Sequence, residues 1–125
     1  MAMQDPSREQ QILANRLSTA IVDIDLQLYK ASIYKLRWGS PGGLDQAIPC
    51  YRTAALVAEE TPWPDELRQT ATELAARVRK YIAILESRDV TTASAQQSLM
   101  IGNFEALRER VRRWPDAEEH SRESG

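Results

Sequence analysis

Few residues of this 125-residue chain combine a reactive side chain with a spacing that enzymes use. The one histidine, His120, lies in the C-terminal segment PDAEEHSRESG, which has no helical pattern. A Ser-His-Asp or Cys-His pair, a histidine-rich zinc site and most general-base schemes all need a histidine held in a fixed structure. We therefore expect none of these sites in the chain.

The one cysteine, Cys50, has two interpretations. Its thiolate could act as a nucleophile if a nearby helix N-terminus lowered the thiol pKa. A half-buried side chain that serves only in packing is the interpretation that we favour. A single cysteine forms no intramolecular disulfide, which is typical of proteins in a reducing compartment.

The carboxylates and the glycine-rich turn also lack the spacing of a reactive site. Asp23 and Asp25 are two residues apart, so on a helix they point about 160° away from each other and cannot share a metal ion. No Glu-x-x-His motif is present, which excludes the usual di-iron bundle. The turn WGSPGG (38–43) lacks the lysine and the spacing of a phosphate-binding loop. We predict no catalytic residue, no metal ligand and no cofactor site, and we do not expect an enzyme.

The composition is that of an ordinary globular protein, with 42% apolar and 27% charged residues and a formal net charge of −2. The segment 115–125 carries four acidic residues and one arginine, which leaves a charge close to zero on the rest. This balance argues against nucleic acid and an anionic membrane as partners. The polar N-terminus MAMQDPSREQQ has no apolar signal core, and no apolar run of about 18 residues is present. We expect a cytoplasmic protein with no membrane association.

Turn signals divide the sequence into four helix-length pieces. The first is expected at 7–36, with Ser7 as its N-cap, and ends at WGSPGG. The others are expected at 44–60, 64–87 and 91–113, separated by TPWPDE (61–66) and by SRDVTT (87–92). Because the connections are short, the pattern predicts an all-α fold, either an antiparallel four-helix bundle or a helical-hairpin array. We expect one helical domain at 7–114, with disordered ends at 1–6 and 115–125.

Two of these helices contain a residue that disfavours a helix interior. Pro49 predicts either a kink in the second helix or a helix that begins at Pro49, and we slightly favour the kink. The pair Gly102-Asn103 falls midway in the fourth piece and could bend or split it. The apolar positions that we assign to this last helix are Ala95, Leu99, Met100, Ala106, Leu107, Val111 and Trp114.

The first helix is apolar on two sides. One stripe repeats with the spacing of a single helix face and comprises Leu17, Ile21, Ile24, Leu28 and Ala31. A second stripe lies roughly 140° away around the helix and comprises Val22, Leu26, Tyr29, Ile33 and Leu36. A helix with two apolar sides touches two neighbours, or one neighbour and a partner chain. We predict a partner-binding face formed by Val22, Asp25, Leu26, Tyr29 and Ile33, extended by Trp38 and Tyr51.

Asp25 lies between the two stripes and needs a hydrogen-bond donor if both are buried. We favour an intramolecular pair with a residue such as Arg77 or Tyr81. A contact with a partner protein is the alternative.

Residues 31–56 resemble one tetratricopeptide repeat. The residues that carry the resemblance are Ala31, Tyr34, Trp38, Gly42, Ala47, Tyr51 and Ala54, and LDQAIPCYRTAAL (44–56) is the closest part. The resemblance implies two antiparallel helices, with small alanines at their contact and aromatic rings filling the space between them. Lys35 stands where the family has a small residue, Pro49 also departs from the pattern, and about three repeats are needed for a stable array. A generic helical hairpin would place the same residue types there through packing alone.

These observations favour a non-catalytic module that binds another protein through an apolar helix face. Such a module would be an adaptor or a small accessory subunit of a larger assembly, or it would form a homo-oligomer. The alternative is a small DNA-binding regulator that uses residues 91–114, whose two halves and arginine-rich end resemble a helix-turn-helix unit. Glu105 and Glu109 alternate with those arginines and dilute their field, so nucleic acid is the less favoured partner.

Overall fold

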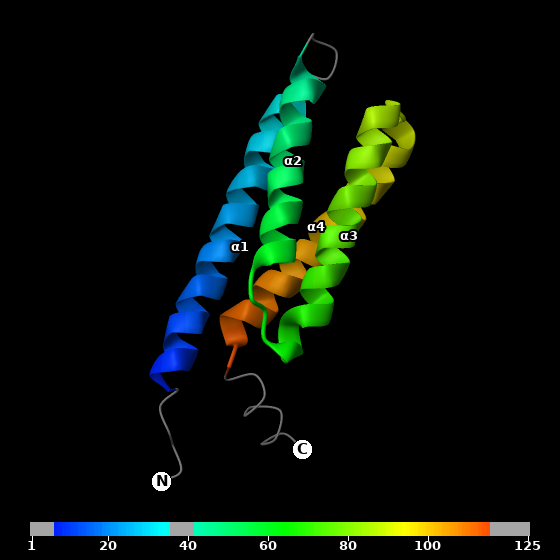
Figure 1. Ribbon diagram of the computed structural model, residues 1–125. Coiled ribbons are helices and arrows are strands. Elements are labelled where there is room, and N and C mark those ends of the chain that lie inside the picture. Colours follow the sequence, from blue (N-terminus) through cyan, green and yellow to red (C-terminus); the bar gives the residue numbers. More distant parts are fainter. Residues whose placement is uncertain (1–6, 36–41, 116–125) are drawn as a thin grey trace.

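The computed structural model describes residues 7–35 and 42–115, and these residues form four α-helices (Figure 1). The helices are α1 (Arg8–Lys35), α2 (Gly43–Glu60), α3 (Asp65–Ser87) and α4 (Val90–Arg113). No strand occurs in the described ranges, so the predicted all-α fold class is confirmed. Of the segments 1–6 and 115–125, for which we predict disorder, residues 1–6 and 116–125 lie outside the described residues, and Pro115 lies in the turn that follows α4.

The helices form two antiparallel hairpins placed against each other. Each helix lies beside the next one in the sequence, and α1 also meets α4 over a short stretch. Among the described residues the backbone of α1 does not approach that of α3, and α2 does not approach α4. In Figure 1, α4 crosses behind α3, and its C-terminal end lies near the N-terminal half of α1. The arrangement is a helical-hairpin array in which α1 is an outer helix.

Local sequence signals explain where the helices begin and end. At the start of α1 the Ser7 hydroxyl accepts a hydrogen bond from the Gln10 amide at 3.0 Å, and the Ser7 amide donates to the Gln10 side chain at 3.1 Å. This reciprocal pair is a capping box, and it confirms Ser7 as the N-cap. Asp89 caps α4 by accepting a hydrogen bond from the Thr92 amide at 3.0 Å. The connection between α2 and α3 is closed by Trp63, whose indole N–H donates to the Ala58 carbonyl at 2.7 Å.

Pro49 and Gly102 both lie inside continuous helices. α2 starts six residues before Pro49, so the alternative of a helix that begins at Pro49 is wrong. Proline has no N–H group, so the Asp45 carbonyl lacks its usual hydrogen-bond donor at position 49. Because Pro49 and Asp45 are both exposed, water can donate to this carbonyl instead. α4 is not split at Gly102, where an added Cβ would meet no atom within 4 Å.

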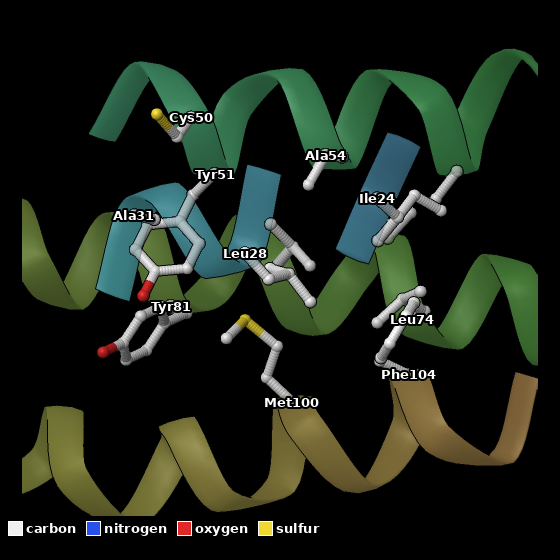
Figure 2. Close-up of a cluster of buried hydrophobic side chains, with 14 of the residues drawn as sticks. Ile24, Leu28, Ala31, Cys50, Tyr51, Ala54, Leu74, Tyr81, Met100 and Phe104 are labelled. Atoms are coloured by element: carbon white, nitrogen blue, oxygen red, sulfur yellow. The ribbon is translucent and has the colours of Figure 1, made fainter. Parts of the chain in front are cut away.

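The core draws side chains from all four helices, as Figure 2 shows for its central part. Tyr51 of α2 meets Tyr81 of α3 edge to face, with ring centroids 5.0 Å apart and planes at 85°. Ala31 of α1 and Ala47 and Ala54 of α2 are fully buried, and their small size lets these helices approach closely. The core therefore ties both hairpins together and fixes how α1 is oriented.

The inner face of α4 differs in part from the predicted one. Met100, Leu107 and Val111 are buried as expected, but Ala95, Leu99 and Ala106 are exposed. The contact side of α4 instead comprises Ala93, Met100, Phe104, Leu107 and Val111.

Candidate protein-binding face

The second apolar stripe of α1 stays outside the core. Its described members are Val22, Leu26, Tyr29 and Ile33, which we call the α1 stripe, and they are 64%, 51%, 64% and 41% exposed. They follow one another at intervals of four, three and four residues, so they lie along one line of the helix. The opposite side of α1 carries Leu17, Ile24 and Ala31, which are fully buried. The α1 stripe is therefore a continuous apolar line on the surface.

The position of α1 in the array explains why this line is uncovered. α1 packs along α2 and touches α4 only briefly, so the core uses one side of the helix. In arrays of helical hairpins the outer helices normally present a polar face to water. α1 presents large apolar side chains instead, and such stripes commonly mark interaction sites.

The other predicted face residues have different positions. Asp25 is exposed beside the α1 stripe, and Trp38 lies outside the described residues. Tyr51 is only 1% exposed and belongs to the core, so its inclusion in the face is corrected. The reason is its place on the inner side of α2, where its ring packs against Tyr81.

Among the described residues, Asp25 has no intramolecular partner, and neither Arg77 nor Tyr81 pairs with it. Arg77 donates to the Gln96 side chain at 3.5 Å, and the Tyr81 hydroxyl accepts a hydrogen bond from Lys35. Asp25 needs no protein donor because its carboxylate is exposed to water. A contact with a partner protein stays the alternative.

Ile12 is a member of the same line that the sequence reasoning missed. It is 58% exposed and lies fourteen residues, or two heptads, before Leu26. The heptad spacing from Leu26 indicates this position. The two positions between Ile12 and Val22 on the same line are the polar residues Asn15 and Thr19, so the apolar pattern is interrupted there.

The charged side chains of α1 have no ion-pair partners within the described part of the chain. The ion pairs there join α2 to α3, as between Arg79 and Glu59 at 2.8 Å, or lie within α3 and α4. Arg16, Asp23 and Lys30 follow one another at intervals of seven residues along one edge of the α1 stripe, and all three are exposed. The stripe is thus bordered by charges that the chain itself does not neutralise.

One lysine at the end of α1 lies in a different setting. Lys35 is partly buried, its ammonium donates to the Tyr81 hydroxyl at 2.5 Å, and it lies 5.2 Å from the centroid of that ring. Burial lowers the pKa of Lys35 from 10.5 to about 8. Burial also raises the pKa of Tyr81 and of Tyr51, whose hydroxyl has no hydrogen-bond partner among the described residues.

The lowered pKa of Lys35 predicts a pH-dependent stability. Between pH 8 and 10.5 the unfolded chain holds the Lys35 proton more tightly than the folded chain, so the free energy of unfolding rises with pH there. Below pH 8 both states are protonated and this dependence disappears. We expect a gain of about 1 kcal/mol between pH 7 and 9.5, less than the full shift implies because water still reaches the side chain.

Urea unfolding of the wild type and of Lys35→Met at both pH values measures this effect. The methionine variant should lose the rise while keeping the length and packing of the side chain. Both pH values are below 10, the usual pKa of tyrosine in an unfolded chain, so that tyrosine ionisation contributes little. An equal rise in both proteins would show that another group is responsible.

The other side chains that could be reactive are either buried or already paired with another charged group. Cys50 is buried, and its thiol lies 3.6 Å from the Gln46 carbonyl of its own helix, to which it donates. An open depression of about 480 Å³ beside the α2–α3 connection is lined in part by Glu59 and Arg68. Arg79 hydrogen-bonds the Glu59 carboxylate and lowers its pKa, and Arg68 lies 2.9 Å from Asp65. No group of three or more His, Cys, Asp or Glu side chains in the described residues is placed to hold a metal ion.

The segment 91–114 does not have the form of a helix-turn-helix unit. Its described residues lie on the single helix α4 and its C-terminal turn. Near the end of this helix Arg112 and Arg113 both contact the Glu109 carboxylate, at 2.7 and 2.9 Å, and hold its pKa below the usual range. The arginine charge that would face a phosphate backbone is therefore partly neutralised within the helix.

No protein-family model, curated protein sequence or solved structure matches this chain. The resemblance of residues 31–56 to a tetratricopeptide repeat therefore stays a prediction, and residues 36–41 of that segment lie outside the described ranges. Among the described helices, none has the length and apolarity needed to cross a membrane.

Proposed function

We propose that the protein is a non-catalytic interaction module that binds a protein partner through the α1 stripe. The observation that carries the proposal is the exposure of Val22, Leu26, Tyr29 and Ile33 along one line of an outer helix. Burying such a line against another protein removes apolar area from water, which is the main driving force of protein association. The role is that of an adaptor or a small accessory subunit of a larger assembly.

The setting and the bordering charges support this assignment. Asp25 and its exposed neighbours border the stripe in the way that polar rims border apolar interface centres. A free thiol kept inside the fold, as at Cys50, suits a reducing compartment, and we place the interaction in the cytoplasm.

Leu26→Asp is the variant that tests the face. Leu26 is 51% exposed in the chain, so an aspartate there should keep the helical circular dichroism and change the free energy of unfolding by about 0.5 kcal/mol or less. In a complex the same carboxylate would be buried among apolar side chains. We expect binding to weaken by about 100-fold or more. Leu99→Asp is the matched control, because Leu99 is 46% exposed on α4.

A photo-crosslinking amino acid in place of Tyr29 reads out the contact in the native cell. We expect a covalent adduct with a protein, and we expect Leu26→Asp in the same chain to remove it while Leu99→Asp leaves it. The same crosslinker at Leu99 should give no such adduct. Absence of an adduct at position 29, or equal adducts at both positions, would refute the proposal. If Leu26→Asp unfolded the chain, the stripe would be core.

A further inference from the structure

The spacing of the α1 stripe is that of a coiled-coil seam. Val22 and Tyr29 occupy one position of a seven-residue repeat, and Leu26 and Ile33 occupy the other apolar position. Such a seam pairs most readily with another helix that carries the same repeat. In a second copy of this chain, α1 is an exposed helix that carries the same repeat.

The charges beside the seam select a pairing. Arg16, Asp23 and Lys30 occupy one flank, are exposed, and alternate in sign at heptad intervals, with no ion-pair partner in the described residues. In an antiparallel pair of identical helices this flank meets the same flank of the other helix. A row that alternates in sign at heptad spacing can therefore neutralise its own copy in the correct register.

We infer that the partner is a second copy of this chain, bound through α1 in an antiparallel, two-fold symmetric pair; this inference rests on the proposed function. The symmetry axis passes between Gln27 and Leu28. Leu26 then lies opposite Tyr29 of the second copy, and Val22 lies opposite Ile33. Asp23 and Lys30 of the second copy lie on the same flank, offset by two residues or about 3 Å along the helix axis, which their side chains can span, and symmetry forms this pair twice.

Other alignments of the two helices are less favourable. Sliding one helix by seven residues toward its own N-terminus places Asp23 opposite Asp23 and Arg16 opposite Lys30, which repel. Sliding by fourteen restores opposite charges but replaces apolar contacts with the polar residues Asn15 and Thr19. A parallel pair in register would bring Asp25 of one chain near Lys30 of the other, but it would also place Asn15 and Thr19 against their own copies in the seam.

The area is sufficient for a reversible dimer. The four side chains of the stripe together expose apolar surface on the order of 400 Å² per chain, the size of the largest apolar patch on many monomers. In this register the two copies of α1, which ends at Lys35, overlap over residues 20–35, a length of roughly 24 Å. With the flanking side chains the dimer would bury about 1,200 Å² in total, at the low end for specific interfaces. A micromolar dissociation constant fits this size.

Charge exchange at Asp23 and Lys30 tests the pairing. Analytical ultracentrifugation of the full chain from about 1 to 200 µM gives the dissociation constant. Asp23→Lys and Lys30→Asp should each weaken the dimer by about tenfold or more, since each replaces two attractive pairs with two repulsive pairs. The double variant should restore the dimer. An equimolar mixture of the two single variants should form a heterodimer that neither forms alone as a homodimer.

Ile12→Asp is the matched control, because Ile12 is 58% exposed on the same line but lies outside the overlap. It should leave the dissociation constant unchanged, whereas Leu26→Asp should abolish the dimer. Circular dichroism of every variant confirms folding, and rescue by the double variant separates charge pairing from damage to the helix.

Each other outcome overturns the inference in a distinct way. A wild type that stays monomeric at 200 µM removes the second copy as partner, while an adduct of Tyr29 with a different protein would leave the proposed function standing. Loss of the dimer with Lys30→Asp but not with Asp23→Lys shows a parallel pair. Loss with Ile12→Asp shows a different register. If Leu26→Asp leaves the dissociation constant of the dimer unchanged, the dimer forms through another surface.

Discussion

Ile24→Asp should unfold the chain, whereas Val22→Asp, two positions away on the same helix, should leave it folded. Ile24 has 0% exposure and lies inside the cluster drawn in Figure 2. An aspartate there would bury a carboxylate with no donor, or take up a proton at neutral pH, and either costs several kcal/mol. We expect a loss of about 4 kcal/mol or more, which is enough to unfold a domain at the low end of the usual stability range.

Val22→Asp is an informative control because it makes a similar chemical change in the same helix. Both substitutions replace a β-branched residue with aspartate at an interior helical position, so the change in helix propensity nearly cancels between them. Val22 is 64% exposed, and its variant should keep the far-ultraviolet circular dichroism and a urea midpoint close to that of the wild type. Unfolding of both variants to the same extent would show that the α1 stripe is core rather than surface.

The number, type and limits of the helices could be predicted from the sequence. The four predicted ranges agree with α1 to α4 to within one residue at each described end. The reason is that the signals at these ends are local: the Ser7 capping box, the proline-rich connection before α3 and the Asp89 cap act within one turn of the chain. A local signal can be read without knowing which helices are neighbours.

The orientation of α4 could not be predicted in the same way. Apolar residues follow one another closely around its middle, so Leu99, Met100, Ile101 and Phe104 leave more than one face available. In the structure, where α4 packs against α3, Met100 and Phe104 are buried, whereas Leu99 and Ile101 are 46% and 39% exposed. Ala95 and Ala106 misled the prediction because a single methyl group is tolerated on either side of a helix.

The candidate site was predictable only in part for a related reason. The sequence shows that α1 has two apolar faces, and the structure leaves Val22, Leu26, Tyr29 and Ile33 exposed. Tyr51 could not be placed, because an aromatic residue on an amphipathic helix serves equally as a surface anchor or as a core ring. Its burial depends on Tyr81, thirty positions away in the sequence.

Leu74→Ala should destabilise both hairpins together. Leu74 has 0% exposure and sits on α3, in the part of the core to which all four helices contribute (Figure 2). Removing its isobutyl group leaves a cavity that a packed interior fills only in part, so we expect a loss of about 3 kcal/mol. For a domain of this size that corresponds to a fall in the melting temperature of about 12 °C or more.

The manner of unfolding tests whether the hairpins form one cooperative unit. Far-ultraviolet circular dichroism follows all the helices, while tryptophan fluorescence includes Trp63, which is buried at the α2–α3 connection. The two probes should give the same midpoint in the wild type and the same lower midpoint in Leu74→Ala. Leu99→Ala, at an exposed position of α4, should change the stability by about 0.5 kcal/mol or less. Separate transitions would mean that the α1–α2 hairpin can detach from the α3–α4 hairpin. The inner side of α1 would then be exposed as well, and the α1 stripe would no longer be a surface with a single orientation.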